Sequence, residues 1–204
     1  LAALSTQDKR ANLHALFTMF DDDGSGSINS SQLPELLSLL GVQDDAVTTR
    51  RLAAQLHADV NGDISRADYD GTFAFYAAQD SVFRQDPKAT EGDDKGDEEM
   101  MATVYQATQR FPLQSWLSAF TSHDADAKRS LTLDQLAQAV DAVQPGEGAA
   151  LAQDMQEQLV ERVGLRDFAR LLASASGETL AGRRVQYAKL WDKAEMPEGV
   201  EHPQ

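Results

Sequence analysis

Apolar residues recur along this chain at helical spacing, and short polar segments separate them. Four residues spaced i, i+3, i+4 and i+7 form the first apolar stripe: Leu13, Leu16, Phe17 and Phe20. A second stripe follows twelve mainly polar residues: Leu33, Leu36, Leu37 and Leu40. Such spacing places each set on one face of a helix. Ser5 and Asp8 favour a helix cap before the first stripe, and Gly41 ends the second. The pattern predicts a helix, a twelve-residue loop and a second helix.

The same outline returns further along the chain. Each predicted loop contains one branched apolar residue: Ile28, Ile64, Leu131 and Val163. The first two are 36 residues apart and the last two are 32 apart, whereas 67 residues separate the middle two. Near-constant spacing indicates a repeated structural unit. We therefore expect an all-α fold of four helix–loop–helix units in two pairs, separated by an insert of about 30 residues.

The repeats divide the chain into four regions. We expect an N-terminal pair at residues 5–80, an acidic insert at 81–110, a C-terminal pair at 111–176, and an extra helix with a tail at 177–204. The acidic run at 91–99 favours a solvated insert. A capping carboxylate and an apolar stripe nevertheless indicate a helix within it: Asp97, Met101, Val104 and Tyr105.

Acidic residues outnumber basic ones by 33 to 18, which gives a formal net charge of −15. This charge opposes binding to the phosphates of nucleic acids and to anionic lipid surfaces. Cations and basic protein segments are its natural counterparts, although solubility alone explains such a charge equally well. The chain contains no cysteine, which excludes disulfides, thiolate metal sites and cysteine nucleophiles.

No apolar run approaches the ~18 residues that a membrane-spanning helix requires. Charged residues also interrupt the first helix, where a signal peptide would be continuously apolar. We expect a soluble protein without membrane insertion, intracellular rather than secreted, in which Leu1 is a processed or truncated terminus. The sequence shows no phosphate loop, nucleophile elbow or paired catalytic carboxylates, which predicts that the protein is not an enzyme.

The first loop carries oxygen-bearing residues around a central glycine, Gly26: Asp21, Asp23, Ser25, Ser27, Asn29 and Gln32. A hard dication takes six to eight oxygen ligands, and a short loop supplies them when alternate residues point inward about a glycine turn. On these residues, and on the helical stripes at both sides, the chain resembles the EF-hand calcium-binding superfamily. The resemblance implies that Ser27 contributes its backbone carbonyl and that Asn29 acts directly or through a water.

The resemblance also implies that paired loops join through a short two-stranded pairing. The opposed residues would be Ile28 with Ile64 and Leu131 with Val163. Two departures weaken the first site, since Ser25 replaces an Asp or Asn and Gln32 stands where the motif has a bidentate Glu. With two carboxylates, we expect a Kd for Ca²⁺ of ~10⁻⁵ M or weaker. The alternative is a loop that keeps its fold without an ion.

The second loop offers a poorer metal site, with Mg²⁺ as the alternative ion. Its candidate ligands are Asp59, Asn61, Asp63 and Asp68. His57 occupies the first position and is a poor ligand for a hard cation, so a vestigial loop is the competing interpretation. In the third loop, Lys128 would neutralise the carboxylates itself. The fourth loop has no Asp, Asn or Gly in its first half, so we expect metal in neither.

A pair of such units can present an apolar groove to a partner helix. The predicted helix at 178–194 would fill a groove or meet a partner through its basic residues: Arg183, Arg184, Lys189 and Lys193. We interpret the chain as a weak Ca²⁺-binding sensor or regulatory subunit. A calcium-independent adaptor or structural subunit of a larger complex is the alternative. The length and uneven loops are more similar to sarcoplasmic calcium-binding proteins than to calmodulin.

Overall fold

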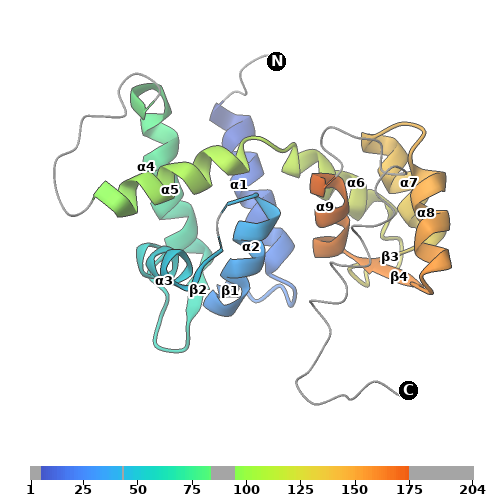
Figure 1. The fold of residues 1–204 in the computed structure, drawn as a ribbon, viewed down its shortest axis with the longest axis horizontal. Coiled ribbons are helices and arrows are strands. Elements are labelled where there is room, and N and C mark those ends of the chain that lie inside the picture. Colours follow the sequence, from blue (N-terminus) through green and yellow to red (C-terminus); the bar gives the residue numbers. More distant parts are fainter. Residues whose placement is uncertain (1–5, 43, 84–94, 175–204) are drawn as a thin grey trace.

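The computed structural model describes residues 6–42, 44–83 and 95–174, and these are mostly helical (Figure 1). Three predicted features lie outside the described residues: Ser5, the acidic run up to residue 94, and the extra helix and tail at 177–204. None of the helices in the described ranges is both long enough and apolar enough to span a bilayer.

The described part of the chain consists of helices with a few very short strands between them. Before the gap it forms α1 (Thr6–Phe20), β1 (Ser27–Asn29), the 3₁₀ turn η1 (Ser30–Gln32), α2 (Leu33–Leu39), α3 (Ala46–Gln55), β2 (Asp63–Ser65) and α4 (Arg66–Phe83). After the gap it forms α5 (Lys95–Thr108), α6 (Leu113–His123), β3 (Ser130–Thr132), α7 (Leu133–Val143), α8 (Gly148–Glu157), β4 (Arg162–Gly164) and α9 (Leu165–Ser174). The predicted all-α class is confirmed.

Side chains fix where several of these helices begin. Asp45 accepts two backbone N–H groups of the first turn of α3, at 2.8 and 2.9 Å. Asn29 and Gln32 exchange side-chain hydrogen bonds with each other's backbone ahead of α2, and Thr132 and Gln135 do the same at the start of α7. The first N–H groups of a helix have no hydrogen-bond partner within the helix. The capping side chains supply these partners and so fix the residue at which each helix begins.

The loops meet in pairs through antiparallel strands. β1 pairs with β2 so that Ile28 lies opposite Ile64, and β3 pairs with β4 so that Leu131 lies opposite Val163. All four side chains are buried. Each strand has three residues, and such short strands are not stable alone. The buried apolar residues therefore hold each pair of loops together.

The insert differs from its predicted form in its second part. Helix α4 extends past residue 80, and α5 packs against α1, α3 and α4. The α5 residues Met101 and Val104 are fully buried, and Arg51 Nε lies 2.6 Å from Asp97 Oδ1. Helix α5 begins at Lys95, ahead of the expected cap. Because an apolar stripe is stabilised by leaving water, this segment joins the core instead of forming a solvated linker.

Helix α1 joins the two pairs of units. It contacts both α4, which precedes residues 84–94 in the chain, and α6, which follows them (Figure 1). Asn12 on α1 is 3% exposed. Its Nδ2 donates to the Phe111 carbonyl at 2.9 Å, and its Oδ1 accepts from the Gln114 N–H at 3.1 Å. A buried amide is costly unless both of its groups are hydrogen-bonded. Asn12 therefore fixes the start of α6 against α1.

Candidate metal sites in the paired loops

The first loop turns back directly after α1. The Gly26 N–H donates to Asp21 Oδ2 at 3.1 Å, and Gly26 has a φ of 80°. Side chains of L residues disfavour this left-handed conformation, whereas glycine adopts it freely. Asp21 is 8% exposed. The glycine thus lets the backbone fold over a largely buried carboxylate.

Oxygen atoms of three residues gather in this turn. Ser25 Oγ lies 3.5 Å from Asp21 Oδ1, 3.4 Å from the Ser27 carbonyl oxygen and 3.0 Å from Ser27 Oγ. Neighbouring oxygens in an octahedral shell, each ~2.4 Å from a calcium ion, are about 3.4 Å apart. The loop therefore spaces three of the predicted ligands as the oxygens of a hard cation are spaced.

Asp23 adds a second negative charge to the loop. Its Oδ1 accepts the Ser25 N–H at 3.0 Å. Hydrogen bonds from the Ser25 side chain and backbone hold the pKa of Asp23 below its ordinary value of 3.8, because they stabilise the ionised form. Asp23 is therefore a carboxylate at neutral pH and can act as a charged ligand.

The last two candidates of the first loop bind the protein itself. Gln32 Oε1 accepts the Asn29 N–H at 2.8 Å, and Gln32 Nε2 donates to the Phe20 carbonyl at 3.1 Å, which ties the end of the loop to its beginning. Asn29 Oδ1 accepts the Ser31 N–H at 3.0 Å, and its Nδ2 donates to Asp63 Oδ1 at 2.8 Å. Gln32 Oε1 keeps a second lone pair and can still offer a neutral ligand, whereas Asn29 Oδ1 already accepts the backbone N–H groups of both Ser31 and Gln32.

The oxygen atoms of the first loop suit a hard cation, but few of them carry a negative charge. Within the ranges that the structure describes, no three acidic, histidine or cysteine side chains come together as a metal-binding group. The first loop thus offers two carboxylates, Asp21 and Asp23, with neutral oxygens around them. Oxygen ligands match Ca²⁺ or Mg²⁺, and the number of charged ligands sets the affinity. These residues fit a weakly bound calcium ion.

The second loop uses its carboxylates to hold its own turn. Asp59 Oδ1 accepts the N–H groups of Asn61 and Asp63 at 2.8 and 2.9 Å. The bonds from Asp63 and Asn61 lower the pKa of Asp59. Asp68 Oδ2 instead accepts the Ser65 hydroxyl at 2.6 Å, at the start of α4. Three candidates thus share one turn, while Asp68 lies in the first turn of α4 and bonds the Ser65 side chain, and metal binding by the second loop stays a prediction.

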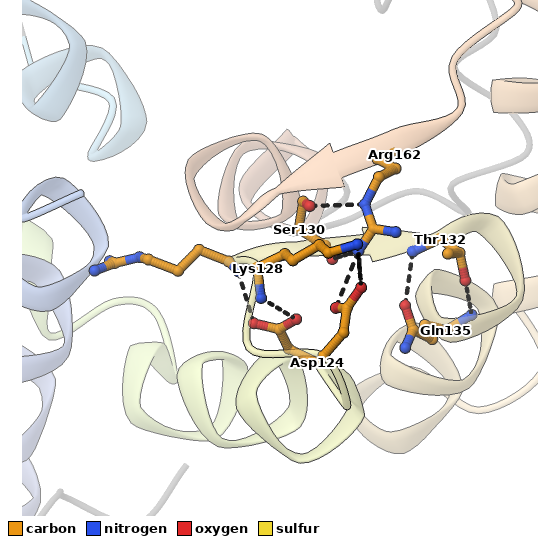
Figure 2. A network of polar contacts seen from close by, with 8 residues as sticks. Asp124, Lys128, Ser130, Thr132, Gln135 and Arg162 are labelled. Carbon is orange, nitrogen blue, oxygen red and sulfur yellow. Dashed lines mark hydrogen bonds and ion pairs between the residues drawn. The ribbon is translucent and has the colours of Figure 1, made fainter. Parts of the chain in front are cut away.

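Two cationic side chains lie in the third loop: Lys128 of the loop itself and Arg162 of β4 (Figure 2). Lys128 Nζ lies 3.2 Å from Asp126 Oδ2, and Arg162 of the fourth loop reaches the same carboxylate. Desolvation raises the pKa of Asp126, but the Lys128 hydrogen bond and the Arg162 charge outweigh it and lower this pKa. The sequence predicts Lys128 beside these carboxylates but does not predict Arg162. The signal that could have found it is the strand register, which sets Arg162 opposite Thr132.

Helix α9 brings further positive charge to the first loop. Arg166 pairs with Asp22 and, at 2.9 Å, with Glu35 Oε2, while its guanidinium carbon lies 5.7 Å from the centre of the Phe20 ring. Arg170 Nη2 lies 2.6 Å from Glu35 Oε1. The local sequence does not predict these contacts, because the partners of Arg166 are 131 and 144 positions away along the chain.

Comparison with known proteins gives a similarity over part of the chain. No protein-family model matches it. The chain is 34% identical over 77 residues to a rice protein (Oryza sativa subsp. japonica) named Probable calcium-binding protein CML21. This stretch is 38% of the chain and spans 39% of that relative's length. The similarity supports the resemblance to EF-hand calcium-binding proteins that the loops indicate.

Proposed function

We propose that this chain is a calcium-binding protein of the EF-hand type and that its first loop binds Ca²⁺ weakly. The observation that carries the proposal is the gathering of Asp21, Ser25 and Ser27 oxygens at separations of 3.4 and 3.5 Å. The similarity to a probable calcium-binding protein of rice supports it. The residues that would hold the ion are Asp21, Asp23, Ser25, Ser27, Asn29 and Gln32.

The paired loops offer a route from an ion to the helices. A bound Ca²⁺ would supply two positive charges to the carboxylates of the first loop. Asn29 connects this loop to Asp63 of the second, and Ile28 lies opposite Ile64 between them. Because α2 follows the first loop and α4 follows the second, a change in loop geometry alters the angles between the flanking helices.

A sensor or regulatory subunit that recognises a protein partner is the role that we propose for this response. The net charge of −15 favours a basic partner segment, since an acidic surface attracts such segments and speeds their encounter. The contact would use a groove between helices or the predicted helix at 178–194.

A calcium-independent adaptor is the second candidate, and one feature favours it. The Gln32 amide bonds Phe20, just before the first loop, and Asn29 within it, so the loop has hydrogen bonds that close it without an ion. In this case the paired units serve as a docking platform for a larger complex.

Calorimetric titration of the full chain with Ca²⁺ and Mg²⁺, after treatment with a chelator, separates the two candidates. We expect a Kd for Ca²⁺ of ~10⁻⁵ M or weaker and at least a tenfold loss of affinity in Asp21→Asn. Asp44→Asn removes the same charge from an exposed position outside the loop and serves as the control. An absence of binding heat at millimolar Ca²⁺, or an equal effect of both variants, contradicts the calcium proposal and favours the adaptor.

A further inference from the structure

The third loop forms the same backbone turn as the first loop but has different side chains at its centre. Asp124 accepts the backbone N–H groups of Lys128 and Arg129 at 3.1 and 2.8 Å, as Asp21 accepts that of Gly26. Arg129 takes the left-handed conformation, with a φ of 56°, at the position that glycine holds in the first loop. The backbone thus forms the same turn although a side chain disfavours it.

The third loop also matches the first loop in the hydrogen bond made by its last residue. Gln135 Oε1 accepts the Thr132 N–H at 2.8 Å, which matches the 2.8 Å bond between Gln32 and Asn29 in the first loop. The two loops therefore make corresponding hydrogen bonds between their first and sixth positions and between their ninth and twelfth positions. They differ at the fifth position, where Lys128 replaces Ser25.

Arg162 is held in the third loop by several bonds (Figure 2). Its Nε donates to Ser130 Oγ at 2.8 Å, and its Nη2 donates to the Ser130 carbonyl at 2.6 Å and to both oxygens of Asp126 at 3.2 Å. The Arg162 side chain is 32% exposed. The corresponding position of the second loop holds Asp63, which has the opposite charge.

We infer that Lys128 and Arg162 are tethered cations that take the place of a divalent ion in the third loop. The two positive charges of Lys128 and Arg162 match the two negative charges of Asp124 and Asp126, while the guanidinium of Arg129 donates to the Thr18 carbonyl of α1. A divalent ion would meet like charges at the position where it needs oxygens. Because both cations belong to the chain, β3 and β4 stay paired at any calcium concentration. The inference does not depend on whether the first loop binds Ca²⁺.

The first test measures amide hydrogen exchange at β3 and β4 in the full chain. In the wild type we expect the same protection with chelator and with millimolar Ca²⁺. Arg162→Gln should raise exchange at these amides about tenfold in chelator. Arg110→Gln removes the same charge from an exposed position and should leave the exchange unchanged. Equal exchange in both variants, or Ca²⁺-dependent protection in the wild type, overturns the inference.

The second test looks for a metal site that the two cations suppress. The background carries Asp21→Asn and Asp23→Asn, so that the first loop does not contribute. Adding Lys128→Asn and Arg162→Gln should create Ca²⁺ binding, with at least a tenfold gain in affinity by calorimetry, and a further Asp126→Asn should remove it. No gain in a folded variant overturns the inference, and if this variant does not fold, the exchange test decides.

The two tests separate this inference from the calcium proposal. Failure of the proposed function appears as an absence of binding in the wild type, whatever happens at β3 and β4. Failure of the inference appears in the exchange at β3 and β4, or as no gain of Ca²⁺ binding when Lys128 and Arg162 are replaced, whatever the wild type binds.

Discussion

At the residue scale, the affinity of the calcium site that we propose in the first loop depends on Gln32. Its oxygen accepts a backbone N–H inside the loop, and its amide nitrogen donates to the Phe20 carbonyl. A glutamate at this position could give two charged oxygens to an ion but could not donate to Phe20. Compared with glutamate, Gln32 lowers the expected affinity for an ion, but its hydrogen bonds close the loop without one.

We predict that Gln32→Glu raises the affinity for Ca²⁺ at least tenfold, because it adds a third carboxylate to the loop. In chelator the variant should lose about 1 kcal/mol of unfolding free energy, since the bond to Phe20 is lost. Calorimetry and denaturant unfolding measure the two effects. Gln135→Glu is the matched control in the third loop, where the local cations should prevent any gain. An equal gain in both variants would contradict the assignment of the site to the first loop.

Asp45 predicts a pH dependence of stability at the start of α3. The Thr48 backbone N–H and hydroxyl lower its pKa below the ordinary value of 3.8. A group with a lowered folded-state pKa stabilises the fold above its unfolded-state pKa, and this contribution disappears as the pH falls through the folded-state value. Asp45→Ala should lower the Tm at neutral pH, and the difference from the wild type should shrink at about pH 2. Asp44→Ala, at the adjacent exposed position, should show neither effect.

At the scale of elements, the short strands depend on apolar packing. β1 and β2 have three residues each, and their central side chains, Ile28 and Ile64, are buried opposite each other. Removing either leaves a cavity between the two loops, which the rigid helices around it cannot fill.

We predict that Ile64→Ala lowers the free energy of unfolding by about 3 kcal/mol, the usual cost of truncating a buried isoleucine. It should also weaken Ca²⁺ binding at the first loop, although Ile64 has no ligand atom. Val60→Ala is the control, because Val60 lies in the same loop and is fully exposed. Thermal unfolding and calorimetry test both statements. Unchanged Ca²⁺ affinity in a destabilised Ile64→Ala protein would show that the loops do not act as a pair.

At the scale of the whole molecule, α9 packs against the N-terminal units. Arg166 contacts Asp22 in the first loop and Glu35 on α2, while Arg170 contacts Glu35 and, at 3.5 Å, Asp167 of its own helix. The side chains of Arg166, Arg170 and Glu35 are about one quarter exposed and that of Asp22 is 46% exposed, so solvent screens each pair in part. Their positive charge nevertheless lies beside the loop that would hold a cation.

We predict that Arg166→Gln raises the Ca²⁺ affinity of the first loop roughly two- to fivefold, because a like charge is removed from its edge. By linkage, Ca²⁺ should weaken the contact of α9 by the same factor, and hydrogen exchange along α9 reports this. Arg170→Gln is the control, since it breaks a contact to Glu35 but none to the loop. An equal rise in both variants would show a general charge effect.

Local sequence was sufficient to predict the helices, the loops and the residues inside them. The stripe from Leu13 to Phe20 became α1, and the resemblance to EF-hand proteins implied that Ile28 faces Ile64, as it does in the structure. Hydrophobic periodicity and helix caps depend on residues within about one helical turn of each other, so the local sequence is enough to predict them. The same holds for the Asp21 turn and for Lys128 beside Asp126.

Only the tertiary structure decided which distant side chains meet. It docks α5 into the core, brings Arg162 into the third loop, and sets Arg166 against Asp22 across 144 positions. Each of these contacts depends on how helices pack, and packing is set by the sum of many side-chain contacts that no local pattern records. The sequence thus determined the candidate ligands, and the fold determined the cations that surround them.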